Sequence, residues 1–148
     1  MDPRTAYPGP TSVVSHIMIV DDEDDYHLIT RMMLKKAGFQ GRLTAYLDPG
    51  KAMEHLRNGS DPPDLLFVDI NMPATDGFAF LEQCLDRTLI QPGRTTVVMC
   101  SSSNRPIDME KAHEVDCVSE YIEKPLTTDQ FLRIAAEHSK RAHTPPKA

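Results

Sequence analysis

The sequence predicts an α/β fold in which a parallel β-sheet is covered by helices on both faces. Three short runs of the 148-residue chain are wholly apolar, namely Ile17–Val20, Leu65–Val68 and Val97–Cys100. Runs of this length and composition are typical of strands that are buried on both faces. Segments with helical periodicity separate them, and this alternation predicts parallel strands that are joined by helical crossovers.

The first strand, Ile17–Val20, follows a segment without periodicity. Residues 1–15 contain three prolines and several small polar residues, and we expect this leader to be disordered. An acidic series, Asp21–Asp25, comes directly after the strand. A helix is then predicted, with Gly38 at the position of the glycine that ends it. Its apolar positions at helical spacing are Ile29, Met32, Met33 and Ala37.

Two further runs have the pattern of strands with one wetter face. Apolar and polar residues alternate in Arg42–Leu47, and Val118–Ile122 has a similar pattern, so we expect both at the edges of the sheet. Between the first of these and the central strand, Asp48-Pro49 has the form of a helix N-cap and Asn58-Gly59 ends the helix. A helix from Phe78 to Leu85 follows the central strand.

The last third of the chain adds two helices. Pro106–Glu114 has only a thin apolar stripe, whereas the final helix opens with a capping box at Thr127–Gln130 and has Phe131 and Ile134 on its apolar face. Residues 139–148 are basic and contain two prolines, so we expect a disordered tail after a domain that spans residues 16–138. The five strands are expected in the flavodoxin-like order 2-1-3-4-5.

Composition excludes several classes of protein. The net charge of −6 and the pI of about 5.4 disfavour binding to nucleic acid or to a membrane surface. No apolar run approaches the roughly 20 residues of a membrane span, and no signal peptide follows Met1, so a cytoplasmic protein is expected. The odd set Cys84, Cys100 and Cys117 predicts buried free thiols. The six histidines have no ligand spacing, and His27 and His113 are expected on helix surfaces.

Polar residues follow four of the predicted strands. Asp21 and Asp22 come after the first strand, Asp69 after the third, Ser101 after the fourth and Lys124 after the fifth. Because the carboxyl ends of parallel strands share one edge, these side chains are expected to converge. Three carboxylates that close to one another require a cation, and oxygen ligands suit Mg²⁺, which leaves coordination positions for phosphoryl oxygens.

In these segments the sequence resembles the receiver domains of two-component response regulators, over about His16–His138. Four short motifs at four strand ends carry the resemblance. They are Ile-Val-Asp21-Asp22-Glu, Val-Asp69-Ile-Asn-Met-Pro-Ala-Thr-Asp-Gly77, Val-Met-Cys-Ser101-Ser-Ser and Tyr121-Ile-Glu-Lys124-Pro125.

The resemblance implies a role for each residue of the site. Asp69 is expected to accept a phosphoryl group from the phosphohistidine of a sensor histidine kinase or a histidine phosphotransfer protein. Mg²⁺ is expected to bind Asp22 and Asp69 directly, Asp21 through water and Asn71 through its carbonyl. Lys124 is expected to pair with the phosphoryl oxygens, and the Lys124–Pro125 bond to be cis as in the family.

The resemblance also implies a switch. The hydroxyl of Ser101 is expected to move to the phosphoryl group, and Tyr121 to turn inward when it does. Three features depart from the family pattern. Serine replaces the commoner threonine, Ser102 stands where a small apolar residue is usual, and the leader is longer than family members need.

These observations lead to the interpretation of a stand-alone, CheY-like response regulator, a monomer or weak homodimer, whose output is a downstream partner protein. One alternative is an interaction module that keeps the fold and ignores phosphate. Another is a phosphatase of the haloacid-dehalogenase kind, which needs a second aspartate where Asn71 stands. Single residues also have plainer interpretations, since Asp21–Asp25 can complement a helix dipole and Tyr121 can be a packing residue.

Overall fold

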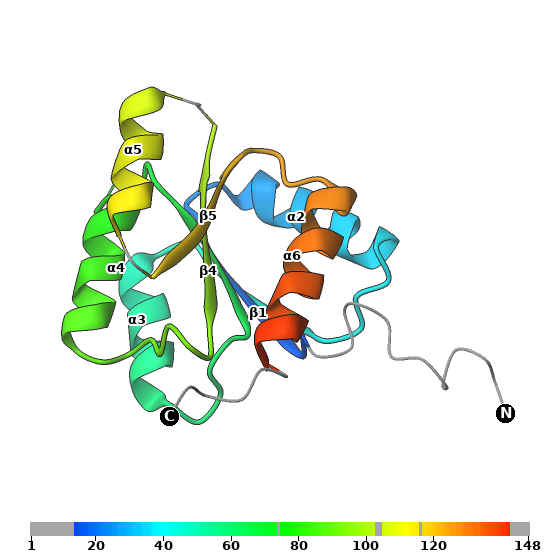
Figure 1. Ribbon diagram of the computed structural model, residues 1–148, viewed down its shortest axis with the longest axis horizontal. Coiled ribbons are helices and arrows are strands. Elements are labelled where there is room, and N and C mark those ends of the chain that lie inside the picture. The colour runs from blue at the N-terminus through cyan, green and yellow to red at the C-terminus, as the bar shows by residue number, and fades with distance from the viewer. Residues whose placement is uncertain (1–13, 74, 103–104, 116, 143–148) are drawn as a thin grey trace, which may run out of the picture.

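The computed structural model describes residues 14–73, 75–102, 105–115 and 117–142. Its centre is a five-stranded sheet, all of whose paired strands are parallel, in the order β2-β1-β3-β4-β5, which confirms the predicted topology. Helices cover both faces (Figure 1). The strands are β1 (His16–Val20), β2 (Arg42–Tyr46), β3 (Leu65–Asp69), β4 (Thr96–Ser101) and β5 (Val118–Glu123). The helices are α2 (Asp24–Lys36), α3 (Pro49–Asn58), α4 (Gly77–Asp86), α5 (Pro106–Glu114) and α6 (Thr128–Ala142).

The core consists of two apolar layers, one on each face of the sheet. Successive side chains of a strand point to opposite faces, so Met18 and Val20 of β1 pack in one layer while Ile17 and Ile19 pack in the other. Helices α3, α4 and α5 cover the first layer, and α2 and α6 cover the second (Figure 1). The central strands β1, β3 and β4 are buried along their whole length, whereas β2 and β5 are half-buried edges, as predicted.

The helix ends follow the predicted capping chemistry. The Asp48 carboxylate accepts a hydrogen bond from the backbone N–H of Gly50 (2.9 Å) at the start of α3, and Gly59 ends that helix with a φ of 71°. At the start of α6, the backbone N–H of Gln130 donates to the Thr127 hydroxyl (3.1 Å), and the backbone N–H of Thr127 donates to the Gln130 side chain (3.0 Å). This reciprocal pair is the expected capping box.

The residues on the buried face of α2 differ in part from those that the sequence predicted. Ile29 and Met32, expected at apolar helical positions, are 51% and 65% exposed, whereas His27, expected on the surface, is 4% exposed. The inward residues include Tyr26 and His27, whose polar atoms hydrogen-bond to backbone groups at the strand ends. These contacts and the buried Leu34 fix the rotation of the helix, so that Ile29 and Met32 face water while the other two predicted positions, Met33 and Ala37, pack against the second layer.

Both ends of the ordered domain extend past the predicted boundaries. Val14 is buried, and Ser15 donates from its backbone N–H (2.8 Å) and its hydroxyl (3.0 Å) to the Asp64 carboxylate. Helix α6 continues to Ala142 because Arg141 in its last turn donates to the Ser119 hydroxyl (3.0 Å). The disorder expected for residues 1–13 and 143–148 falls outside the described residues.

Cys84, Cys100 and Cys117 are buried, as predicted, and form no disulfide among the described residues. Burial raises the pKa of Cys84 and of Cys100 to about 12. Both thiols therefore stay protonated at neutral pH and are poor nucleophiles. Within the described ranges, no helix has the length and apolar character that crossing a membrane requires.

Gly77 allows the start of α4 to close against the end of β3, which leads to a first prediction. A Cβ at Gly77 would lie 2.4 Å from the backbone oxygen of Asp69 and 2.9 Å from Cε of Met99. Gly77→Ala should therefore lower the free energy of unfolding by about 1–3 kcal/mol, since a packed backbone must shift. Urea denaturation measures the change.

Gly93→Ala is the matched control, because nothing lies within 4 Å of a Cβ at Gly93. It should leave the unfolding midpoint unchanged or slightly raised. Equal stability of the two variants would contradict the close approach at Gly77.

Candidate functional site

The polar residues predicted at the strand ends do converge at the carboxyl edge of the sheet. Asp69 is the last residue of β3 and Ser101 the last of β4, while Asp21 and Lys124 directly follow β1 and β5. Parallel pairing places these ends side by side, with Ser101 opposite Glu123 in the register of β4 and β5. Asp21, Asp69 and Ser101 are buried, with relative exposures of 1%, 3% and 0%.

The ammonium group of Lys124 is the positive charge at the centre of this edge. Its Nζ lies 2.5 Å from Oδ2 of Asp21, 3.3 Å from Oδ1 of Asp69 and 3.4 Å from Oε1 of Glu23. It also lies 4.5 Å from the centre of the Tyr26 ring. A single cation therefore neutralises part of three carboxylates in a largely water-excluded position, where charge interactions are strong.

The protonation behaviour of the site follows from this charge balance. Burial, followed by the charge of Asp21, raises the pKa of Asp69 to about 6 even though Lys124 and the backbone N–H of Asn71 oppose the shift. Burial alone would lower the pKa of Lys124, but its contacts with Asp21, Asp69 and Glu23 outweigh burial and hold the pKa above its ordinary value. The site thus carries more negative charge than the lysine compensates.

These residues fit a hard divalent cation. One carboxylate oxygen from each of Asp21, Glu23 and Asp69 lies within 4.8 Å of the others, and the donors are all oxygen, as Mg²⁺ prefers. The raised pKa of Asp69 reflects the same uncompensated charge. Asp22 is half-buried and is not part of this three-carboxylate group. Glu23, which is exposed and which the sequence interpretation left out, is part of it.

The remaining predicted residues surround the same edge. Asn71 is exposed, two residues after Asp69, and its backbone N–H lowers the pKa of that carboxyl group. Tyr121 is half-buried on β5 and packs against the apolar layer under α3, α4 and α5. The Lys124–Pro125 peptide bond is cis, as the resemblance implied. Ser103, the second residue after Ser101 in the sequence, lies outside the described residues.

Two residues that support the site were not found from the sequence. His27 donates from Nε2 to the backbone oxygen of Asp21 (2.6 Å) and so holds the acidic loop after β1. Tyr26 lies under the Lys124 ammonium and accepts a hydrogen bond from the backbone N–H of Leu126 (3.4 Å). Both are on the inward face of α2, and the only sequence signal would have been two polar-tipped residues directly after the acidic series.

Residues 17–136 match the family described as response regulator receiver domain. Because the match covers most of the chain, the protein belongs to this family. It is therefore the receiver domain of a two-component response regulator, with a CheY-like fold.

Proteins of similar sequence indicate the same class, a two-component signalling protein. The transcriptional regulatory protein YxdJ of Bacillus subtilis is 30% identical over 134 residues, which cover 88% of this chain and 52% of the relative. Two-component system protein A of Emericella nidulans is 26% identical over 86% of this chain and 19% of its own length. This chain thus spans about half of one of these relatives and a fifth of the other.

Solved structures share the fold at lower sequence identity. A two-component response regulator from Cytophaga hutchinsonii superposes with a TM-score of 0.79 at 21% identity, over 86% of this chain and 98% of that one. A response regulator receiver protein from Dyadobacter fermentans gives 0.72 at 24% identity, over 84% and 97%.

The raised pKa of Asp69 leads to a second prediction, for metal-free protein. Between about pH 4 and pH 6 the folded state binds a proton at Asp69 more tightly than the unfolded state does, so this residue's contribution to stability falls as the pH rises through that window. Asp69→Asn removes the buried charge and should stabilise the fold at pH 7 by about 1–3 kcal/mol. The advantage should disappear near pH 4, where the native carboxyl group is also neutral.

Chemical denaturation at both pH values in the presence of a chelator measures this difference. Asp76→Asn is the control, because Asp76 is exposed and an asparagine can still accept the hydrogen bond from the Ala79 backbone N–H. A gain for Asp69→Asn that is equally large at both pH values would contradict the buried-charge explanation.

Proposed function

We propose that this receiver domain accepts a phosphoryl group on Asp69, in the presence of Mg²⁺, from the phosphohistidine of a sensor histidine kinase or a phosphotransfer protein. The observation that supports the proposal most directly is the position of Asp69. Its carboxylate is buried at a strand end, 3.3 Å from a lysine ammonium and beside two further carboxylates. An aspartate that only accepts hydrogen bonds from backbone amides would need neither the lysine nor the neighbouring carboxylates.

The chemistry requires little covalent work from the protein. An oxygen of Asp69 attacks the phosphorus atom, the O–P bond forms as the N–P bond of the phosphohistidine breaks, and the nitrogen keeps the electron pair and takes a proton from water. Mg²⁺, held by Asp69 with Asp21 and Asp22 or Glu23 and by the Asn71 carbonyl, would supply electrostatic stabilisation of the phosphoryl oxygens. Lys124 then exchanges part of its pairing with Asp21 for a phosphoryl oxygen.

The output is proposed to pass through Ser101 and Tyr121 to a partner protein. Phosphorylation adds a charge of about −1.5 to −2 and three acceptor oxygens beside the buried Ser101 hydroxyl. Movement of that hydroxyl towards the phosphoryl group would change the loop that leads into α5, and Tyr121 on the neighbouring strand would repack. The partner then distinguishes the two states of the surface formed by α5, β5 and α6.

Phosphorylation itself gives the third prediction. Incubation with Mg²⁺ and a small phosphodonor should add one phosphoryl group by intact mass, in a linkage that is stable to acid and labile to base. Asp69→Asn should abolish the mass gain, while Asp76→Asn should not, because the Asp76 carboxylate caps α4 and faces solvent.

Other outcomes would argue against Asp69 as the acceptor or in favour of another function. Equal phosphorylation of Asp69→Asn would exclude Asp69 as the acceptor. Sustained turnover of a phosphate ester would favour the phosphatase interpretation, and partner binding that ignores Asp69→Asn would favour a phosphate-independent module.

The apolar stripe of α2 is the proposed contact for the protein phosphodonor. Leu28, Ile29 and Met32 are 59%, 51% and 65% exposed on a helix that begins three residues after Asp21. A donor that brings its phosphohistidine to Asp69 passes this end of the helix, and exposed apolar side chains that gather on one helix face mark interaction surfaces.

The fourth prediction separates docking from chemistry. Met32→Asp should slow phosphotransfer from a histidine phosphotransfer protein by about tenfold or more, which corresponds to the loss of one well-placed contact, and leave phosphorylation by a small phosphodonor unchanged. Ile107→Asp is the matched control, because Ile107 is 68% exposed but lies on α5, on the other face of the sheet (Figure 1). Equal effects of the two variants would exclude α2 as the specific docking face.

A further inference from the structure

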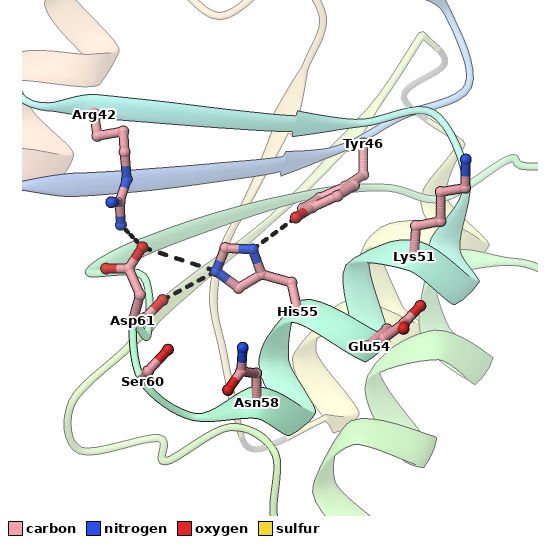
Figure 2. Close-up of a pocket in the computed structure, with 8 residues that line it drawn as sticks. All are labelled: Arg42, Tyr46, Lys51, Glu54, His55, Asn58, Ser60 and Asp61. Carbon is pink, nitrogen blue, oxygen red and sulfur yellow. Dashed lines mark hydrogen bonds and ion pairs between the residues drawn. The ribbon is translucent and has the colours of Figure 1, made fainter.

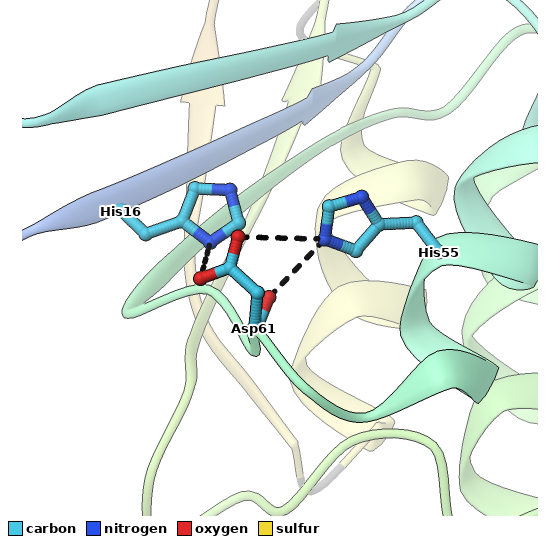
Figure 3. A group of neighbouring side chains, drawn as sticks. All are labelled: His16, His55 and Asp61. Atoms are coloured by element: carbon cyan, nitrogen blue, oxygen red, sulfur yellow. Dashed lines mark hydrogen bonds and ion pairs between the residues drawn. The ribbon is translucent and has the colours of Figure 1, made fainter.

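A second polar cluster lies at the amino edge of the sheet, opposite to Asp69. His16 is the first residue of β1, His55 lies in α3, and Asp61 lies in the loop that leads from α3 to β3. Figure 3 shows the two imidazole rings on either side of the Asp61 carboxylate. The histidines are 39 positions apart in the sequence and have no motif spacing, so only the fold brings them together.

The inner nitrogens of both rings face the same carboxylate. Nδ1 of His16 lies 3.5 Å from Oδ1 of Asp61, and Nε2 of His55 lies 3.9 Å from Oδ2 of Asp61. One ligand atom from each of the three residues lies within 4.8 Å of the others. Around a tetrahedral Zn²⁺ with bonds of about 2.0–2.1 Å, ligand atoms are about 3.4 Å apart. Small rotations of His55 and Asp61 would therefore close the set around a metal ion.

The outer nitrogens are held by hydroxyl groups. Nε2 of His16 lies 2.7 Å from the Thr44 hydroxyl, and Nδ1 of His55 lies 2.6 Å from the Tyr46 hydroxyl. At His16 the Thr44 hydroxyl can accept the ring N–H, which leaves the lone pair of Nδ1 directed at the centre of the cluster. In this structure Nε2 of His55 donates to the backbone oxygen of Asp61 (3.1 Å), so metal binding requires this proton to move to Nδ1, where the Tyr46 hydroxyl can accept it. Histidine ligands of metals in proteins are oriented by outer partners of this kind.

His16 supplies an independent observation that points to a ligand. It is 3% exposed, and its Nδ1 has no hydrogen-bond partner among the described residues. A buried nitrogen left without a hydrogen bond carries a desolvation cost that a metal ion would remove. Burial, followed by the charge of Arg42, lowers the pKa of His16 and of His55, which favours the neutral ring that metal ligation requires.

In this structure the guanidinium group of Arg42 supplies the positive charge that a bound metal ion would supply to Asp61. Its Nη2 pairs with Oδ2 of Asp61, while its side chain is 57% exposed and can move into solvent. Arg42, His55 and Asp61 line the same surface pocket, which has a volume of about 630 Å³. Figure 2 shows how these three side chains lie. The pocket has room for the water molecules that would complete the coordination.

We propose that His16 Nδ1, His55 Nε2 and the Asp61 carboxylate form a binding site for a Zn²⁺-like transition-metal ion that displaces Arg42. Two imidazoles and one carboxylate favour such an ion over Mg²⁺. The bound ion would connect the start of β1, helix α3 and the loop before β3. This site does not depend on phosphorylation, because it lies at the other edge of the sheet from Asp69.

The fifth prediction is a metal titration with Zn²⁺, and with Co²⁺ as a spectroscopic probe, in excess Mg²⁺ so that the carboxylates near Asp69 are occupied. Wild-type protein should bind one ion, with a visible Co²⁺ spectrum of nitrogen-containing coordination and a raised thermal midpoint. His55→Gln and Asp61→Asn should each weaken binding at least tenfold and remove the spectrum. Arg42→Met should tighten binding about tenfold, since it removes the competing cation.

His113→Gln is the matched control, because His113 is exposed on α5 and lies outside the cluster. Circular dichroism and phosphorylation of Asp69 by a small donor report whether each variant is folded. Binding that is equal in wild type and Asp61→Asn, or that Arg42→Met does not tighten, would overturn the proposal. Failure of the wild-type protein to accept a phosphoryl group would contradict the proposed function of Asp69 and not the metal site.

Discussion

The constraint on which the functional edge depends is the compensation of buried negative charge. Asp21 and Asp69 lie at the ends of adjacent central strands with almost no exposed surface, and among the described residues the Lys124 ammonium is the cation that pairs with both. The pKa of Asp69 remains raised, to about 6, because one ammonium group does not balance all the carboxylates. An edge with this residual charge is suited to a divalent cation and then to a phosphoryl group, each of which changes the charge balance and so the preferred structure of the loops.

At the opposite edge of the sheet, a buried carboxylate is compensated by hydrogen bonds instead of by a lysine. Burial would raise the pKa of Asp64, but the nearby His138 ring (Nε2 3.8 Å from Oδ1) and hydrogen bonds from Ser15 and from the backbone of His16 outweigh it and hold the pKa well below its ordinary range. This carboxylate is therefore satisfied by the fold and has no need of a ligand. Asp61, by contrast, is balanced by a side chain that is more than half exposed. The difference explains why Asp61 and its two histidines, rather than Asp64, are suited to exchange partners.

Helix α2 connects the architecture to recognition. Its inward face is anchored by Leu34 in the apolar layer and by polar contacts, from His27 to the Asp21 carbonyl and from Tyr26 to the region after Lys124. The rotation of the helix is thus set by the same loops that form the carboxyl edge. As a consequence, an apolar stripe is exposed to solvent beside those loops, where it costs stability only through its hydration and is available for contact with another protein.

The sequence alone determined the order of the strands and the identity of the carboxyl edge, because apolar runs of strand length and the polar residues that end them are local features, and parallel topology places those ends together. It also determined the helix caps at Asp48 and Thr127, which depend only on neighbours within three positions. The rotation of α2, the participation of Glu23 and the meeting of His16 with His55 were decided by the tertiary structure. These features depend on which distant backbone groups and charges each side chain reaches, and local periodicity carries no information about such contacts.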